Sequence, residues 1–368
     1  MPMSDLKEIE RVTKRKRTPL LVVDRSVIRR KFRELQESIG NASIYYALKT
    51  NPHWRIIELL QELGSNFEIS SDGELKLLLR RGISPQRIIS SNPVKTETFI
   101  KAASKVGINL FAFDSYAELE KLAKFAPGSK VYVRLTVSND GSQWPLTNKF
   151  GVEIEDAVAL LEEAQKKRLV PYGITFHVGS QCIDSETWVK AIEKSKMAWE
   201  SANDRGIELQ MLNIGGGFPI EYQGYSPSIG KIAEHVKGAI NRHFPENVEI
   251  FVEPGRFLVG EAGILVTTVI GKAVRNGKKW LYLDIGVFNG LMESIGGIKY
   301  PMSFPNNGPL EACVLAGPSC DSVDVIQSDV LLPKLDVGDN VYILSAGAYT
   351  TAYASQFDGF TIPQMVLM

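Results

Sequence analysis

Residues 44–52, IYYALKTNP, predict a buried β-strand that ends in a lysine. Ile44, Tyr45 and Tyr46 belong to the β-branched and aromatic types that favour strands, whereas Pro52 cannot donate to a sheet and ends the segment. Lys49 is therefore expected at the mouth of a hydrophobic strand. An ammonium group at the end of an apolar strand suggests that Lys49 has a role in catalysis or in ligand binding.

Strand-like and helix-like segments alternate on both sides of this stretch. Eight apolar strands, separated by helices, are expected up to about residue 258, and this alternation is typical of a (β/α)8 barrel. After Gly260 the apolar segments GILVTTVI, KKWLYLDI, ACVLAG and NVYIL follow one another with little helix between them. We therefore expect an α/β fold, with a TIM-like barrel over residues 25–258 and an all-β domain formed by residues 1–24 and 259–368. The early segment PLLVVD, residues 19–24, is expected to pair with the β-domain.

Composition excludes several classes of function. The 42 basic and 42 acidic residues cancel, so neither a nucleic-acid nor a membrane partner is expected. Residues 1–20 are charged and predict no signal peptide, and the basic run KRKR at residues 14–17 is expected to be a solvated terminal segment. The three cysteines have no CxxC spacing and the histidines no HExxH spacing. No metal site or disulfide framework is expected, and the cysteine usage favours the cytoplasm.

The candidate active site lies where the barrel strands end, because barrel enzymes place their chemistry at the carboxyl ends of the strands. The residues expected there are Lys49, Glu68, Asn92, Asp114, Arg134, His177, Gly215, Gly216, Gly217 and Glu253.

Glycine-rich loops follow the last two predicted strands of the barrel. NIGGGFP follows the seventh strand and EPGR follows the eighth. In barrels these two loops commonly hold a phosphate, since glycine lets it approach the backbone N–H groups. A Rossmann fingerprint is excluded because Ile220 stands where the last glycine would be needed.

A lysine opposite a phosphate site suggests pyridoxal 5'-phosphate (PLP). This cofactor needs an amine for a Schiff base, an anion beside its pyridine nitrogen and a flat group against its ring. Lys49, Glu253 and His177 are expected to supply them. A lone lysine is more often ion-paired at the surface and a lone histidine more often structural, so the prediction rests on finding all three at one rim.

Eight motifs occur in order along the chain: YYALKTNP, FEISSDGEL, KFG, FHVGSQC, NIGGGFP, EPGR, GPSCDSVDV and GAYTTAYASQFDGF. With them the sequence resembles the fold-type III PLP-dependent decarboxylases, the ornithine/lysine/diaminopimelate decarboxylase family, and most nearly its bacterial ornithine/lysine members. The resemblance runs from about Pro19 to Phe360. It implies the alanine racemase-like arrangement of a barrel and a second, all-β domain.

The resemblance also implies residue roles. Lys49 would form the Schiff base, His177 would stack on the ring, Glu253 would hold the pyridinium proton, and Cys320 would be the catalytic proton donor. The implied cofactor-binding residues are Lys49, Glu68, Arg134, His177, Ser180, Gly216, Gly217, Glu253, Gly255, Arg256 and Tyr349. The implied substrate-binding residues are Asp321, Tyr349 and Phe357. Cys320 and Asp321 would enter the partner subunit's site, so the family pattern implies a homodimer with shared active sites.

The segment CDSVDV bears on the substrate. Asp321 follows Cys320, and an aspartate suits the distal ammonium of ornithine or lysine, which predicts decarboxylation to a diamine in polyamine metabolism. Gly296 and Gly297 stand where bacterial relatives usually carry another acidic residue. A decarboxylase for a modified or carrier-bound amino acid therefore stays open as an alternative.

Three other functions are alternatives for a PLP-type barrel with a β-domain. A PLP-dependent racemase would need a catalytic tyrosine on the second domain. A non-catalytic PLP carrier is usually a barrel alone. An antizyme-like protein without PLP is disfavoured, because Lys49, His177 and Glu253 are all present.

Overall fold

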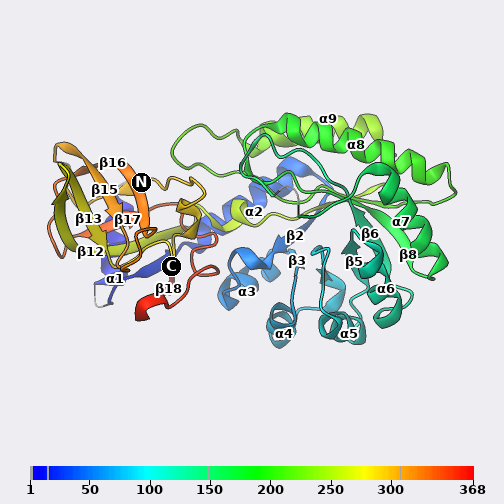
Figure 1. Cartoon of the computed structure of the whole chain (residues 1–368), viewed down its shortest axis with the longest axis horizontal. Coiled ribbons are helices and arrows are strands. Elements are labelled where there is room, and N and C mark those ends of the chain that lie inside the picture. Colours follow the sequence, from blue (N-terminus) through cyan, green and yellow to red (C-terminus); the bar gives the residue numbers. More distant parts are fainter. Residues whose placement is uncertain (1–2, 15, 147–148, 307) are drawn as a thin grey trace. The chain divides into compact units, whose positions relative to one another are not determined.

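The computed structural model describes residues 3–14, 16–146, 149–306 and 308–368, so that Arg15 of the KRKR run lies outside the described residues. The described chain folds into two compact units, shown in Figure 1. One unit comprises Arg29–Pro219 and Pro227–Gly255, and the other comprises the residues up to Ile28, Ile220–Ser226 and Arg256–Met368.

The first unit is a barrel of parallel strands. Among the described residues eight strands follow one another in the order β4-β3-β2-β11-β10-β8-β6-β5. A bridge between Ser90 and Phe111 joins the two ends of this order, so the ring is nearly closed. The strands are β2 (Ser43–Ala47), β3 (Asn66–Glu68), β4 (Ile88–Ile89), β5 (Leu110–Phe113), β6 (Lys130–Arg134), β8 (Val170–Thr175), β10 (Met211–Asn213) and β11 (Glu249–Val252). The predicted fold class is confirmed.

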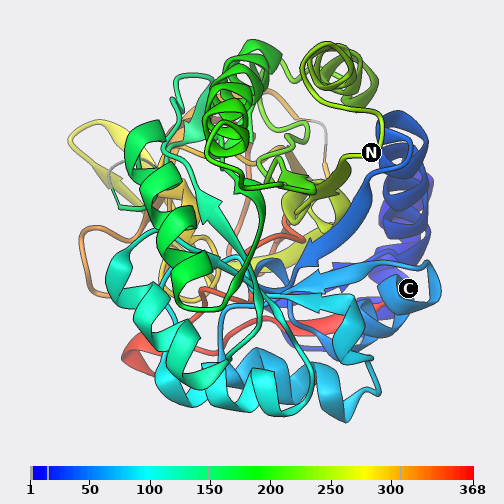
Figure 2. The same cartoon turned by 90° about the vertical axis from the view of Figure 1, so that its right-hand side faces the viewer.

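Helices surround the barrel strands, as Figure 2 shows in an end view. They are α2 (Arg25–Ile39), α3 (Trp54–Glu62), α4 (Asp72–Arg80), α5 (Glu97–Lys105), α6 (Tyr116–Phe125), α7 (Ile154–Lys166), α8 (Ser185–Asn203) and α9 (Ile229–His243). Hydroxyl N-caps begin several of them: Ser71 accepts from the N–H of Glu74, Thr96 from Phe99 and Ser115 from Glu118. Each cap satisfies a backbone donor that the first helical turn leaves unpaired.

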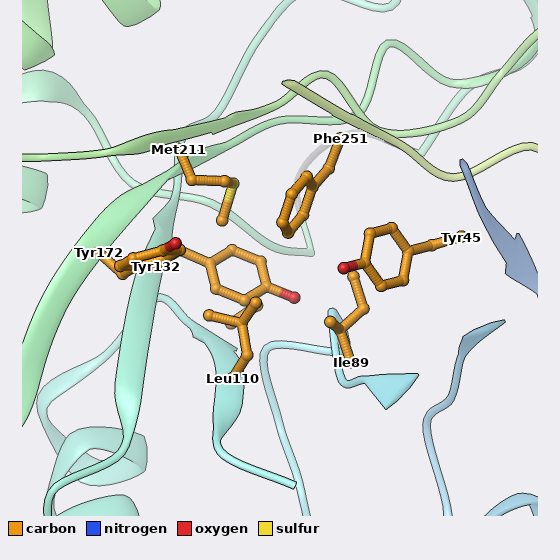
Figure 3. Packing of buried hydrophobic residues seen from close by; sticks show 8 residues of the cluster. Tyr45, Ile89, Leu110, Tyr132, Tyr172, Met211 and Phe251 are labelled. Carbon is orange, nitrogen blue, oxygen red and sulfur yellow. The ribbon is translucent and has the colours of Figure 1, made fainter. Parts of the chain in front are cut away.

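The barrel interior is filled by large side chains, as Figure 3 shows. The cluster consists of Tyr45, Ile89, Leu110, Ala112, Tyr132, Tyr172, Met211 and Phe251. The rings of Tyr45 and Phe251 lie 4.7 Å apart, centroid to centroid. Because side chains fill the interior, the barrel has no central channel. Polar functional groups are therefore expected at the ends of the strands.

The second unit is built around an open sheet with the strand order β14-β17-β12-β13-β15-β16. The strands are β1 (Leu20–Val23), β12 (Gly263–Arg275), β13 (Lys278–Leu283), β14 (Met302–Ser303), β15 (Leu310–Ala316), β16 (Val325–Pro333), β17 (Asn340–Ile343) and β18 (Gln364–Leu367). Strand β1 pairs antiparallel with β12 and parallel with β18, so the predicted pairing of residues 19–24 is confirmed.

Several elements of this unit were not predicted, namely the helices Met3–Thr13 and Arg256–Val259 and the strands β14, β16 and β18. Helix α1 (Met3–Thr13) precedes the basic run, and β16 follows the CDSVDV segment. Ser328 and Asp329 interrupt the apolar pattern of β16, which weakens its strand signal. Strand β16 forms because it pairs with β15, from Leu310 opposite Pro333 to Ala316 opposite Val325. This hydrogen-bond ladder cannot be predicted from the local sequence of β16.

Neither a membrane-crossing helix nor a group of metal-ligating side chains is present in the described part of the chain. Its helices are too short or too polar to span a bilayer. Its His, Cys, Asp and Glu side chains form no cluster that could hold a metal ion.

Candidate active site

Lys49 and Glu68 face each other at the carboxyl ends of neighbouring strands. Lys49 lies in the 3-10 turn Leu48–Thr50 that follows β2, and Glu68 is the last residue of β3. The Nζ atom of Lys49 lies 3.9 Å from Oε2 of Glu68. Glu68 is buried, and its Oε2 has no hydrogen-bond partner among the described residues. A buried carboxylate oxygen of this kind is costly, so it fits a pocket that awaits a polar ligand.

Glu253 follows β11 and is held by two donors. Its Oε1 accepts hydrogen bonds from the Ser91 hydroxyl and from Nδ2 of Asn213, the latter at 2.5 Å. The Ser91 hydroxyl also lies 2.6 Å from the Tyr132 hydroxyl. Since Ser91 gives its only proton to Glu253, Tyr132 must donate to Ser91. The carboxyl group is thereby fixed above the packed interior of the barrel.

The charge of Glu253 is strongly influenced by its surroundings. Burial raises the pKa of Glu253, and the negative charge of Glu68 raises it further, whereas Ser91, Asn213 and Lys49 act in the opposite direction. A cation beside Glu253 would relieve both unfavourable effects. A protonated pyridine nitrogen is such a cation, so the site fits PLP on this point.

His177 follows β8 and is present as a neutral imidazole. Its Nδ1 accepts a hydrogen bond of 3.0 Å from the backbone N–H of Gly179. Desolvation lowers the pKa of His177 well below its usual value, and the positive charges of Arg134 and Lys49 lower it further. A neutral ring can lie against an aromatic cofactor without adding to the positive charges of Arg134 and Lys49.

Arg134 ends β6, and the KFG motif lies beside it. Its guanidinium group lies 5.3 Å from the centre of the Phe150 ring, and the N–H of Gly151 donates to Asp114 at 2.8 Å. Desolvation lowers the pKa of Arg134, while Glu253, Asp114 and Glu68 raise it. The KFG motif thus contacts Asp114, which follows β5, and Arg134, which ends β6. Both residues belong to the group of charges that includes Glu68 and Glu253.

The glycines of the two predicted phosphate loops have no room for a side chain. A Cβ on Gly216 would collide with the carbonyl of Glu253, and one on Gly217, where φ is +95°, with the carbonyl of Gly179. A Cβ on Gly255 would collide with the hydroxyl of Thr50. That hydroxyl is buried and has no hydrogen-bond partner in the described structure. Close packing therefore requires glycine at these three positions, and the unsatisfied Thr50 hydroxyl beside Gly255 fits a site for a polar ligand such as phosphate. Ser180, the first residue of β9 (Ser180–Cys182), lies next to Gly179 in the chain.

The remaining predicted site residues belong to the second unit. Arg256 forms a bidentate ion pair with Glu293 there, and its guanidinium carbon lies 5.0 Å from the centre of the Tyr349 ring. The predicted place of Arg256 and Tyr349 around the phosphate stays a prediction. Cys320 and Asp321 are exposed, and the ring of Phe357 lies 4.6 Å from that of Phe288.

Sequence reasoning missed three residues that hold the pocket in place. The sequence predicts the strand end at Asn92, one residue after Ser91. Asn213 lies within the NIGGGFP motif, whose glycines carry the predicted role, and Tyr132 has the pattern of an ordinary core residue. Alternation along β6 could have placed Tyr132 in the barrel interior, but its partner Ser91 lies 41 residues away.

An amine, a buried carboxyl group and glycine loops at the carboxyl end of a barrel define a PLP enzyme of the barrel type. The family model for the pyridoxal binding domain of pyridoxal-dependent decarboxylases matches residues 25–260. The chain belongs to this family of PLP-dependent decarboxylases.

Known proteins similar to the chain include both enzymes and a regulator. The lysine/ornithine decarboxylase of Selenomonas ruminantium is 35% identical over 98% of this chain and 92% of its own length. The lysine/ornithine decarboxylase of Vibrio vulnificus, solved with cadaverine, is 33% identical, with a TM-score of 0.93 over 100% of this chain and 99% of its own. Antizyme inhibitor 2 of Xenopus laevis is 32% identical over 94% of this chain and 79% of its own length.

Proposed function

We propose that this enzyme decarboxylates ornithine, lysine or both to the corresponding diamine, as a step of polyamine metabolism. The observation that carries the proposal is Asp321, an exposed carboxylate directly after Cys320 in a loop of defined shape. Its Oδ1 accepts a hydrogen bond of 2.9 Å from the N–H of Val323. The similarity to lysine/ornithine decarboxylases over the whole chain supports the same substrate class.

Different residues of the barrel would bind PLP and orient it. Lys49 offers the amine to which PLP attaches, and Glu253 holds a proton at the ring nitrogen. An ion pair at 4 Å and an effective dielectric near 20 is worth about 4 kcal/mol, which keeps that nitrogen charged. His177 would cover one face of the ring, Arg134 would line the pocket near Lys49, and Ser180 and the glycine loops would receive the phosphate. Bound PLP supplies an electron sink for the pair of electrons released as carbon dioxide leaves.

Asp321 and Cys320 would act on the substrate itself. The Asp321 carboxylate pairs with the distal ammonium, and the Cys320 thiol returns a proton to Cα. Both residues are exposed on the second unit. We propose that they complete the site of a partner subunit, so that the enzyme is a homodimer with shared active sites.

The domain boundaries and the compartment are also part of the proposal. A PLP-binding barrel over residues 25–258 and a β-domain from residues 1–24 and 259–368 would divide the chain. Cys182, Cys313 and Cys320 are all free thiols, which supports a reducing compartment such as the cytoplasm.

The experiment is a measurement of carbon dioxide release from a panel of L- and D-amino acids, with wild-type protein and an Asp321→Ala variant. In the proposed dimer the partner subunit's site encloses Asp321, and loss of a charged hydrogen bond buried in this way costs about 2–5 kcal/mol. The variant should therefore lose most of its kcat/KM for ornithine or lysine. Asp329→Ala, at an exposed position of β16, is the matched control and should retain activity. Unchanged turnover of the best substrate by Asp321→Ala would refute a basic substrate.

A modified or carrier-bound amino acid is the second candidate, and one structural observation favours it. The loop after the 3-10 turn Met292–Ser294 closes tightly, since the N–H groups of Gly296 and Ile298 both donate to the carbonyl of Glu293. The Glu293 side chain is paired with Arg256. No carboxylate in this described loop is left for a distal amine. Faster decarboxylation of an amino acid substituted at its distal nitrogen than of free ornithine would select this candidate.

A further inference from the structure

Asp358 binds both the backbone and the side chain of Cys320. Its Oδ2 accepts a hydrogen bond of 3.2 Å from the Cys320 N–H and one of 3.3 Å from the Cys320 thiol. The two residues are 38 positions apart in the sequence and belong to the same unit. The contact is therefore made by the tertiary fold of the β-domain.

Both partners are held in place by their own loops. Asp358 lies in the 3-10 turn Phe357–Gly359 with φ +54°, a backbone conformation that Asp and Asn tolerate better than other side chains. The Gly359 N–H donates to Gln356 and the Phe360 N–H to Phe357, which closes the turn around Asp358. The carboxylate thus has a fixed direction.

The loop that carries Cys320 is folded around the buried side chain of Asp324. Its Oδ1 accepts from the Val287 N–H at 2.8 Å, and its Oδ2 accepts from the Ser319 N–H at 3.0 Å and the Ser319 hydroxyl at 2.6 Å. A Cβ on Gly286 or Gly317 would collide with this carboxylate. Cys320 therefore projects from a rigid support toward Asp358.

We propose that Asp358 is a positioning residue that keeps the Cys320 thiol protonated and directed for proton delivery. This inference rests on the proposed role of Cys320 as proton donor. In that step the S–H bond breaks and the proton goes to Cα of the substrate. The resulting thiolate, which lies beside the carboxylate of Asp358, then recovers a proton from water.

The charges around the thiol act in one direction. The hydrogen bond and the negative charge of Asp358 raise the pKa of Cys320, and Asp321, on the loop of the cysteine itself, adds to the effect. An ordinary cysteine, with a pKa near 8.5, is already partly thiolate at slightly alkaline pH. A thiolate has no proton to donate, so a neighbouring carboxylate preserves the form that the reaction needs.

A purely structural role for Asp358 makes a different prediction. As an acceptor for the Cys320 N–H, the residue would merely join two loops. Asparagine preserves this acceptor and the shape of the side chain but removes the charge. Asp358→Asn therefore tests whether Asp358 controls the protonation of the Cys320 thiol or only joins the loops of the two residues.

The test is the titration of Cys320 in the PLP-bound enzyme without substrate. The rate of iodoacetamide alkylation at Cys320 is followed against pH by mass spectrometry. Cys182 and Cys313 are buried, so the reaction should be specific. Asp358→Asn should shift the inflection to lower pH and should increase the alkylation rate near pH 7.5 several-fold. Asp329→Asn is the charge-matched control and should leave the inflection where it is in the wild type.

A second measurement covers the case in which subunit association shields the thiol from alkylation. Thiolate absorbance near 240 nm, taken as the difference between each protein and its Cys320→Ser counterpart, reports the same ionisation. Equal inflections for wild type and Asp358→Asn would overturn the proposal. Failure of the proposed function would be seen elsewhere: Cys320→Ala would then leave the products unchanged, whether or not the titration shifts.

Discussion

Arg256 and Glu293 form a buried bidentate ion pair, with Nη1 of the arginine 2.7 Å from Oε2 of the glutamate and Nη2 2.5 Å from Oε1. Tyr222 adds its hydroxyl, at 2.7 Å from Nη1. The pKa of Arg256 is raised well above its usual value, despite the opposing effect of burial, because Tyr222 and Glu293 favour the charged form. The pair connects the segment after Gly255 to the loop that contains Gly296 and Gly297.

The first prediction concerns the stability of this pair. Removing one partner of a buried ion pair leaves an uncompensated charge and costs about 3–5 kcal/mol. Glu293→Gln should therefore lower the free energy of unfolding by an amount of that order, measured by urea denaturation. Glu311→Gln is the control, because the ion pair of Glu311 with Lys279 is partly exposed rather than buried. Equal stability of Glu293→Gln and wild type would contradict the structural role.

The second prediction concerns cofactor attachment. Lys49 Nζ is expected to bind PLP covalently, so purified protein should absorb in the visible region. Borohydride should fix the cofactor on the peptide that contains Lys49, as read by mass spectrometry. Lys49→Arg should lose the covalent signal while retaining the charge next to Glu68. Finding PLP fixed on another lysine would show that the assignment is wrong.

The third prediction concerns shared active sites. Lys49→Ala and Cys320→Ala variants should each lose normal activity. After the subunits exchange, hybrid dimers should contain one site with both residues intact, so the mixture should regain part of the activity. The control is a mixture of Lys49→Ala with itself under the same exchange conditions. No recovery despite demonstrated exchange would rule out sites shared between subunits.

The fourth prediction concerns the hydrogen bonds on Glu253. Asn213→Ala removes a donor from a buried carboxylate, and a hydrogen bond to a charged group contributes about 1.5–3 kcal/mol. PLP should bind about tenfold to a hundredfold more weakly, measured by titrating the PLP-free protein at several pH values. The loss should increase as Glu253 becomes harder to ionise, that is, toward lower pH. Unaltered affinity, with folding intact, would show that Asn213 does not position Glu253.

The fifth prediction concerns pH and Glu74. Burial, followed by the charge of Glu68, raises the pKa of Glu74 to about 7 from 4.5. The folded chain therefore holds a proton that the unfolded chain releases. The resulting stability is fully present below about pH 4.5 and is lost as pH rises through about 7.

Glu74→Gln should remove this dependence. The free energy of unfolding of PLP-free wild type should decrease between pH 5 and pH 8 relative to that of the variant, measured by urea denaturation at both values. Glu200→Gln, at an exposed place on α8, should follow the wild type. Parallel behaviour of Glu74→Gln and wild type would contradict the assignment.

Much of the fold was predictable because its signals are local. Each barrel strand is a short apolar run between helical segments, and the β-domain strands after Gly260 are equally distinct. Helix α1 and the strands β14, β16 and β18 were not predicted. Strand β16 contains Ser328 and Asp329, and it is a strand because β15 provides a hydrogen-bonding partner.

The candidate site was predictable to a similar extent and for a similar reason. Lys49, His177 and Glu253 each follow a strand, and the ends of parallel barrel strands meet at one rim. The contacts between residues far apart in the sequence were not predictable. Asn213 is 40 residues from Glu253, and Asp358 is 38 from Cys320.

The sequence by itself determined the barrel, the β-domain and the motif residues, because apolar periodicity and glycine placement act over a few neighbouring positions. Only the tertiary structure determined the pKa values of the ionisable groups in the site. Burial, and then the negative charge of Glu68, raise the pKa of Glu253, while Asp358, on a turn of its own, raises the pKa of Cys320. Electrostatic energies depend on the distances between charges and on their burial, and neither can be read from the order of residues along the chain.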